Sequence, residues 1–200
     1  MDTGAVPKSF HRSTAATGSH HHRGSTWHRS WPAALGGLVA AGTAYGLTDA
    51  RAVAPIVAAS GLVYLAAGAS GRRGAAWIAF AVTFALITLQ KFVGLDALPW
   101  LLALAAALLV VGIAGRRSRP WWSFPLQAAA MVVLGAIAFV ALQLNPTAGG
   151  LLVAAALLGH AGWDIHHFRA DRVVAQSLAQ FCAVLDVLVA VFVAVLALHS

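Results

Sequence analysis

Long apolar stretches separated by short polar breaks fill the chain from Trp31 almost to its last residue. A transmembrane helix needs about 20 apolar residues, with a range of about 17 to 25, and every stretch lies in that window or within a residue of it. The pattern therefore predicts an all-α fold, a polytopic membrane protein with seven transmembrane helices. The stretches are 31–47, 52–70, 75–93, 97–114, 121–144, 148–165 and 173–198.

The breaks between these stretches are short and contain Gly, Pro, Asn, Asp and Arg, which are typical turn residues. Short connections place consecutive helices antiparallel and adjacent. Residues 1–30 are different, because they are rich in Ser, Thr, Gly, His and Arg and contain almost no aliphatic side chains. Such a segment cannot bury enough surface to order itself. We expect a disordered basic tail over 1–30 and a transmembrane domain over 31–200.

The composition fits a membrane protein, because 60% of the residues are hydrophobic and only 10% are charged, against about 25% charged in soluble domains. The net charge of +7 would suit a nucleic-acid-binding protein, but the basic residues stand in small groups between apolar stretches rather than on one polar face. We therefore expect the lipid bilayer as partner and no nucleic acid. The expected location is the cell membrane, inner or plasma.

The distribution of Lys and Arg predicts the orientation. If the amino terminus is cytoplasmic, only Arg51 and Lys91 of the thirteen basic residues fall outside, which leaves eleven on the cytoplasmic side. Cytoplasmic loops carry an excess of Lys and Arg, so the amino terminus is predicted inside and the carboxyl terminus outside. The Trp residues agree, because indole rings favour the membrane interfaces. At predicted cytoplasmic ends lie Trp31, Trp77, Trp121, Trp122 and Trp163, and at an outer end lies Trp100.

The stretch from Gly159 to His167 interrupts the apolar pattern and is the best candidate for a functional site. At about 100° per residue, His160, Asp164 and His167 share one stripe of a helix, with Asp171 further along it. The first two are expected one to two turns inside the cytoplasmic end of the sixth span, and His167 at its exit. Two imidazoles and at least one carboxylate therefore face the same side.

His160 and Asp164 are candidate metal ligands, because imidazole and carboxylate groups four residues apart can converge on one ion. His160 and His167 lie about 10.5 Å apart along a helix axis, which is too far for both to bind it, so a third ligand would come from another helix. Zn or another divalent transition metal is the expected cofactor of such a site. Without a metal, Asp164 would hydrogen-bond a neighbouring His, and the basic residues after it would face anionic headgroups.

Asp186 and Cys182 join His160, Asp164 and His167 as candidates for binding a ligand or a proton. Asp186 lies about 20 Å into a hydrocarbon core about 30 Å thick, where a charged Asp costs about 2.5–3.5 kcal/mol. It must therefore be protonated, face the bundle or have a partner. Two interpretations stay open, a proton-carrying or ligand-binding carboxylate and a structural hydrogen bond to another helix. Candidate partners for that bond are Tyr45, Tyr64 and Thr83.

The pattern His160-x2-Trp163-Asp164-x2-His167, followed by Cys182-x3-Asp186 on the next helix, resembles a motif pair in small polytopic bacterial membrane proteins of unassigned function. It covers roughly the last 45 residues and implies no activity. The arrangement is also similar to seven-span metal hydrolases of the alkaline ceramidase and adiponectin receptor type, which place His and Asp near the cytoplasmic face. Those have a paired His-x3-His in the last helix, where this chain has Cys182-x3-Asp186.

Three functions from different classes fit these patterns. The first is a membrane protein with a cytoplasm-facing His/Asp site between the sixth and seventh helices that binds or carries a small ligand or ion. It predicts that Asp186 and His160 share one cavity. The second is a membrane-embedded metal-dependent hydrolase acting on a lipid, which requires further ligands from other helices. The third is a structural or partner subunit, whose polar residues would be dispersed hydrogen-bonding pairs.

Overall fold

The computed structural model describes Met1 and residues 27–199, and its described residues form helices and no strands. This confirms the all-α prediction. Six segments are long and apolar enough to cross a membrane, one of them formed by η1 and α2 together. The helices are α1 (Trp27–Ala44), η1 (Ala50–Val53), α2 (Ala54–Ser70), α3 (Ala75–Val93), α4 (Ala97–Ala114), α5 (Phe124–Gln143), α6 (Pro146–Ala170) and α7 (Gln176–Leu198).

The helix α1 differs from the predicted first span, 31–47, and is not among the six segments. It begins at Trp27 and ends at Ala44, and Gly46 beyond it has a φ of +68°, which favours glycine. Its apolar part from Trp31 onward is about 21 Å long, shorter than a hydrocarbon core of about 30 Å. The seventh span therefore stays a prediction. Apart from Met1 and 27–30, the expected disordered tail lies outside the described residues.

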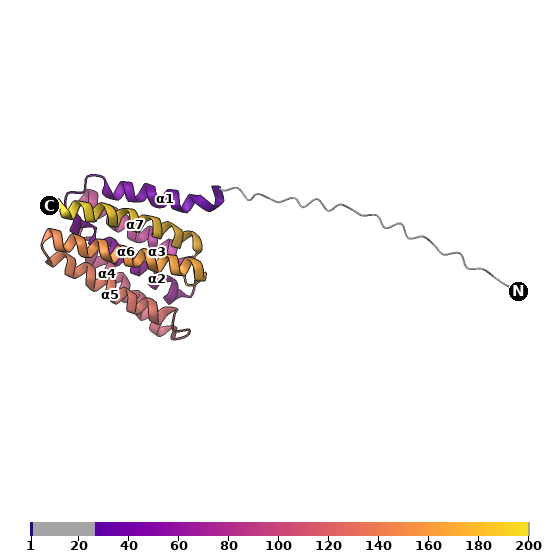
Figure 1. Cartoon of the computed structure of the whole chain (residues 1–200). Coiled ribbons are helices and arrows are strands. Elements are labelled where there is room, and N and C mark those ends of the chain that lie inside the picture. The colour runs from indigo at the N-terminus through magenta and orange to yellow at the C-terminus, as the bar shows by residue number, and fades with distance from the viewer. Residues whose placement is uncertain (2–26, 200) are drawn as a thin grey trace.

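The helix α2 forms the centre of the bundle. Every residue of it from Ala54 to Ala69 is buried, because other helices surround it. A helix in this position must be mainly apolar on all sides, as α2 is. It packs against α3, α4 and α5, while α6 and α7 form a tightly paired unit beside it. Figure 1 shows the helices side by side, with α1 at one edge next to α7 and α5 on the opposite side.

Glycines allow two of these helix pairs to approach closely. A Cβ atom on Gly36 of α1 would lie 2.6 Å from the backbone oxygen of Phe181 in α7. A Cβ atom on Gly150 of α6 would lie 2.7 Å from Cβ of Ala197 in α7. Close packing of small residues is the usual source of helix association in membranes. The two glycines therefore hold α1 and α6 against α7, the helix that carries Asp186.

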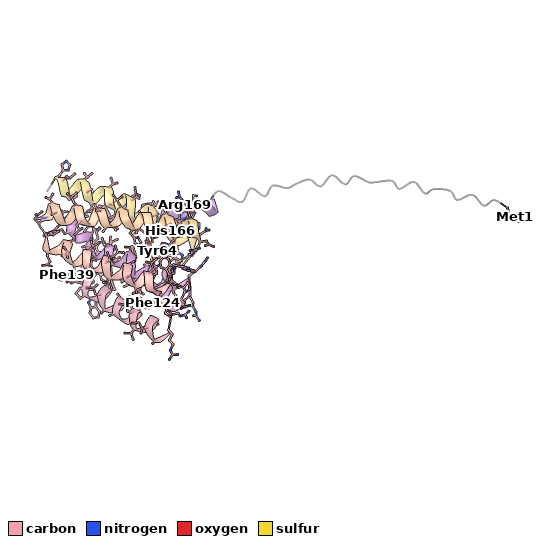
Figure 2. All side chains as sticks on the ribbon, turned by 60° about the horizontal axis from the view of Figure 1, so that its bottom comes forward. Met1, Tyr64, Phe124, Phe139, His166 and Arg169 are labelled. Atoms are coloured by element: carbon pink, nitrogen blue, oxygen red, sulfur yellow. The ribbon has the colours of Figure 1, made fainter. Side chains whose placement is uncertain are left out.

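The loops 71–74, 115–123 and 171–175 come together at one end of the bundle, called here the Arg-rich end. Arg73 binds Asp171 with 2.9 Å between Nη1 and Oδ1, and Arg117 donates to the carbonyl of Ser70 over 3.0 Å. The guanidinium of Arg172 lies 5.1 Å from the ring centre of Trp122. In Figure 2, Arg169 and His166 lie at this end and Tyr64 further inside. These contacts tie the connecting loops to one another.

Arg51 and Lys91, the two basic residues at the opposite end, bind backbone carbonyls where helices end. Lys91 donates to the carbonyls of Gly42, over 2.7 Å, and of Thr43 and Tyr45. Arg51 donates to the carbonyl of Leu144 over 2.9 Å. Such carbonyls lack partners within their own helix and carry partial negative charge. Arg51 and Lys91, the two exceptions to the charge bias, therefore bind the partially negative carbonyls at helix ends. Arg51 also pairs with Asp49, and its hydrogen bond keeps the pKa of that carboxyl below its usual range.

Candidate functional site

His160, Asp164 and Asp186 converge between α6 and α7, and we call them the triad. The Nδ1 atom of His160 lies 2.8 Å from Oδ2 of Asp186 and 3.4 Å from Oδ2 of Asp164. One ligand atom from each residue lies within 4.8 Å of the others. The spacing of four residues places His160 and Asp164 on the same face of α6, and that face packs on α7. The three residues are 5%, 0% and 1% exposed.

Tyr64 brings a third helix to the triad, because it extends from the middle of α2. Its hydroxyl donates to Oδ1 of Asp164 over 2.7 Å, and its ring meets the imidazole of His160 edge-on with 5.4 Å between the centres. Tyr64 is itself 1% exposed. A hydroxyl held in this way fixes the orientation of the carboxylate and leaves its other oxygen, Oδ2, directed at His160.

Two polar atoms of the triad have no hydrogen-bond partner in the described part of the chain. They are Oδ2 of Asp164 and Nε2 of His160, and both are buried. The reason is a shortage of donors, because an imidazole nitrogen carries one hydrogen at most and Asp186 lies closer to Nδ1 than Asp164 does. An unpaired buried polar group costs about 1–3 kcal/mol. The triad therefore has unused capacity to bind a proton or a cation.

His167, predicted on the same stripe, contributes to a second polar cluster nearer the Arg-rich end. Its Nδ1 atom donates to the carbonyl of Trp163 over 3.0 Å, which leaves Nε2 as an acceptor 3.5 Å from the amide nitrogen of Gln127 in α5. The ring of Tyr64 lies 5.0 Å from that of His167, centre to centre. Tyr64 thus stands between the triad and this cluster. His167 is near the triad but is not one of its three converging residues.

The other residues of the predicted site have different positions. Cys182 is buried on α7, one turn before Asp186, and is close enough to Asp164 and Asp186 to interact with both electrostatically. Asp171, at the end of the predicted stripe, is outside the triad, because it takes the left-handed conformation that ends α6 and pairs with Arg73. The predicted stripe on α6 is therefore buried at His160, Asp164 and His167 but reaches the surface at Asp171.

The expected partners of Asp186 were wrong, because the carboxylate binds His160 instead of a hydroxyl. Tyr64 donates to Asp164, Thr83 donates to the carbonyl of Phe80, and Tyr45 is 80% exposed. The residue spacing did not specify how α6 and α7 are rotated toward each other, so it could not identify this pair. The sequence predicted that His160 and Asp186 share one cavity; the structure places the two side chains in direct contact.

The triad lies deeper than the sequence pattern suggested. The predicted sixth span ended at residue 165, but α6 continues to Ala170. His160 is therefore about 15 Å from the last residue of α6 along the helix axis, about half of a hydrocarbon core about 30 Å thick. Asp186 lies near the middle of α7. The group belongs to the interior of the bundle and not to its end.

Tyr64 and Gln127 were not singled out as site residues by the sequence pattern. Tyr64 was considered only as a partner for Asp186, and Gln127 was not considered. A signal was present in both cases, because each is a polar side chain within a long apolar stretch. Such a side chain must find a partner inside the bundle. Gln127 is fully buried and donates to the carbonyl of Trp122 over 3.1 Å.

The charges of the triad determine which ligands it suits. If both carboxylates are ionised and the imidazole is neutral, the triad carries two negative charges, and a net charge is costly in a buried site. A divalent cation would cancel both charges, and bound protons would reduce them. The donors are one nitrogen and two carboxylate oxygens, a set that suits Zn and similar transition metals.

No family model matches this chain, and no curated protein or solved structure is found to be similar to it.

Proposed function

We propose that this chain is a seven-span membrane protein that binds one divalent transition-metal ion, with Zn preferred, at His160, Asp164 and Asp186. The proposed ion lies in the bundle interior, reached from the cytoplasm through the Arg-rich end. The observation that carries the proposal is the convergence of three buried ligand atoms from two helices. The unpaired Oδ2 atom of Asp164 supports it further, because a structural pair would leave no carboxylate oxygen without a donor.

The two distances from Nδ1 of His160 suit a metal after one small adjustment. Ligands at about 2.0–2.1 Å from a tetrahedral Zn lie about 3.3 Å from each other. The 3.4 Å between Nδ1 of His160 and Oδ2 of Asp164 already meets this spacing. The 2.8 Å to Oδ2 of Asp186 is shorter, so an ion would replace the hydrogen bond and move these two atoms apart by about half an ångström.

Tyr64 would act as the residue that orients a ligand. Metal-bound carboxylates and imidazoles are usually held by hydrogen bonds from neighbouring groups, and the Tyr64 hydroxyl provides such a bond to Oδ1 of Asp164. The free oxygen then faces the centre of the triad. The helix α2 is buried on all sides, so this hydroxyl has a fixed position. The three ligands would therefore be largely preorganised.

Burial favours ion binding over the other two functions. A lipid hydrolase requires a reacting group that the lipid can reach, and the triad residues are at most 5% exposed. A purely structural role predicts dispersed pairs, whereas three ionisable residues meet here with an excess of acceptors. A buried cation site accounts for both features. Entry and release of the ion would require the Arg-rich end to open.

Metal analysis of the purified protein tests the proposal. The full chain would carry Ala in place of His20–His22, because a run of three His could bind metal by itself, and it would carry no affinity tag. We expect about one transition-metal ion per chain by inductively coupled plasma mass spectrometry, in line with the single site that the donors form. His160→Ala and Asp186→Asn should each lose it. The matched control is His166→Ala, because His166 is an exposed imidazole on the same helix and should leave the metal content unchanged.

The possible results separate the three functions. Absence of metal, even after incubation with Zn and dialysis, would overturn the ion site. If His160→Ala then lowers thermal stability, the triad is a structural hydrogen-bonded group. Release of fatty acid from lipid by the Zn-loaded protein, but not by the metal-free protein, would establish the hydrolase instead.

A further inference from the structure

Two recesses lie on the same pair of helices, away from the triad. The first is an apolar groove of about 320 Å³ between the middle parts of α4 and α5. Its lining includes the small residues Ala105, Gly135 and Ala136 and the larger residues Leu109 and Phe139. Small side chains on both helices leave a space that neighbouring side chains of the bundle do not fill. In a bilayer this groove opens toward the lipid chains.

The second recess, of about 610 Å³, lies in the loop that joins α4 to α5 at the Arg-rich end. It is lined by Ser118, Arg119, Pro120 and Trp121. Arg119 and the neighbouring Arg116 are exposed, and neither forms an ion pair with a carboxylate among the described residues. Trp121 is 69% exposed, and indole rings favour the headgroup region. This recess is therefore basic and lies where a headgroup would be.

The basic recess and the apolar groove lie one after the other along α4, as the headgroup and the acyl chains do in a phospholipid. At about 1.5 Å per residue, Leu109 and Leu102, both of which line the groove, lie about 10 and 21 Å from Arg116 along α4. One leaflet of hydrocarbon is about 15 Å deep. The groove therefore begins inside the leaflet next to the loop and reaches about 6 Å past the inner boundary of that leaflet, so it can hold the lower part of an acyl chain whose headgroup is level with the loop. Figure 2 shows the extent of α5, with Phe124 near the loop and Phe139 toward the other end.

From this arrangement we propose that an anionic phospholipid binds along α4 and α5, with its phosphate at Arg119 and Arg116 and one acyl chain in the groove. The basic loop selects a negative headgroup by charge, because juxtamembrane Lys and Arg attract anionic lipids. The groove selects a chain by shape, because the alternative is an unfilled apolar surface. This lipid site is independent of the metal site.

A second copy of the chain is a weaker candidate for the groove. Two copies with the same orientation in the membrane pair about an axis normal to the bilayer, which would bring their α4–α5 loops together. Arg116, Arg117 and Arg119 of each copy would then face one another at close range. Like charges at such distances repel, whereas a lipid phosphate between them attracts. The charge of the loop therefore favours a lipid.

Native mass spectrometry of the full chain in detergent tests this site. The protein would receive equal amounts of phosphatidylglycerol and phosphatidylcholine with identical acyl chains. We expect bound phosphatidylglycerol to exceed bound phosphatidylcholine by about thirtyfold, since two Arg near one phosphate contribute about 1 kcal/mol each and every 1.4 kcal/mol corresponds to about tenfold in binding. The double variant Arg116→Gln, Arg119→Gln should abolish this preference. Ala136→Leu, which fills the groove from an exposed position, should reduce retention of both lipids.

Two control variants separate a specific lipid site from general effects of charge and side-chain size. Arg169→Gln removes an exposed charge from the same end of the bundle, and Ala103→Leu enlarges an exposed residue of α4 that does not line the groove. Neither should change lipid binding. Equal binding of the two lipids, or equal losses in controls and variants, would overturn the proposal. A dimer that Ala136→Leu dissociates would also overturn it, because the groove would then be a contact between copies.

Discussion

His160 of α6 and Asp186 of α7 are in contact, with 2.8 Å between Nδ1 and Oδ2, and this contact joins two helices in the middle of the bundle. The same nitrogen lies 3.4 Å from a second carboxylate, that of Asp164. One hydrogen on one nitrogen cannot satisfy two carboxylates. The pair is therefore both a link between helices and a site that is incomplete without a further proton or cation.

Substitution of Asp186 separates its structural role from its charge. Asp186→Leu would remove the nearer acceptor of Nδ1 of His160 and leave only Oδ2 of Asp164, at 3.4 Å, so we expect it to destabilise the protein by about 1–3 kcal/mol. Asp186→Asn retains a carbonyl oxygen of the same size, so its effect should be smaller. Thermal unfolding in detergent with excess chelator measures both without a contribution from bound metal.

A surface carboxylate provides the control for this comparison. Asp171 pairs with Arg73, but the two side chains are 55% and 51% exposed, and exposed pairs contribute only about 0–1 kcal/mol. Asp171→Asn should therefore have little effect, and Asn tolerates the left-handed backbone at this position. Equal tolerance of Asp186→Leu and Asp186→Asn would contradict the buried contact with His160.

Tyr64→Phe tests whether the hydroxyl positions Asp164 for metal binding. The change removes the hydrogen bond to Oδ1 but retains the ring between the two His. Loss of such an orienting group typically weakens metal binding by about 10–100-fold. We expect a loss of that size in Zn affinity, measured by competition with a chromogenic chelator. The folded protein should remain, because the ring still fills its place beside α6.

Tyr45→Phe is the matched control, because Tyr45 and Tyr64 are the only two Tyr in the chain. Tyr45 is 80% exposed and its ring lies 5.9 Å from Nζ of Lys91. Phe preserves this ring contact, so Zn affinity should not change. If Tyr64→Phe binds Zn as tightly as the parent, the hydroxyl does not orient a ligand and the proposed role of Tyr64 is wrong.

Much of the fold follows from apolar stretches and turn residues. The stretches 75–93 and 97–114 coincide with α3 and α4, because Gly94 takes a left-handed conformation after α3 and Asp96 caps α4. The end of α6 was placed too early. Polar residues after position 165 suggested a break, but His167 faces the interior and the helix continues to Ala170. Polarity alone does not end a helix whose polar side chains have buried partners.

The site was predictable only within one helix. Residue spacing places His160 and Asp164 on one face of α6, and they do lie on the same side. The contact with Asp186 depends on the depth and rotation of α7, which are set by close packing at residues such as Gly150 and Ala197. No residue pattern encodes that geometry directly. Tyr64 was missed as a partner of Asp164 for the same reason.

The helix α1 is not among the six segments that are long and apolar enough to cross a membrane. Two contacts give its extent relative to α3. Trp31 near its start stacks on Trp77 at 5.9 Å, and the carbonyl of Gly42 near its end binds Lys91. Trp77 and Lys91 lie near opposite ends of α3, about 21 Å apart along the helix axis. The helix α1, which packs on α7, thus spans nearly the same length of the bundle as α3, which favours a seventh crossing.

Reporter fusions decide between six and seven crossings. A fluorescent protein that matures only in the cytoplasm should be active when fused before Met1, or inserted in 71–74 or 115–120, and inactive after Ser200. The reason is the excess of Lys and Arg on one side. An inactive fusion at Met1, with the two loop insertions still active, would mean that α1 lies on the bundle without crossing. Activity after Ser200 would instead mean that α7 does not carry the chain across, and Asp186 would then lose the membrane position on which the ion site depends.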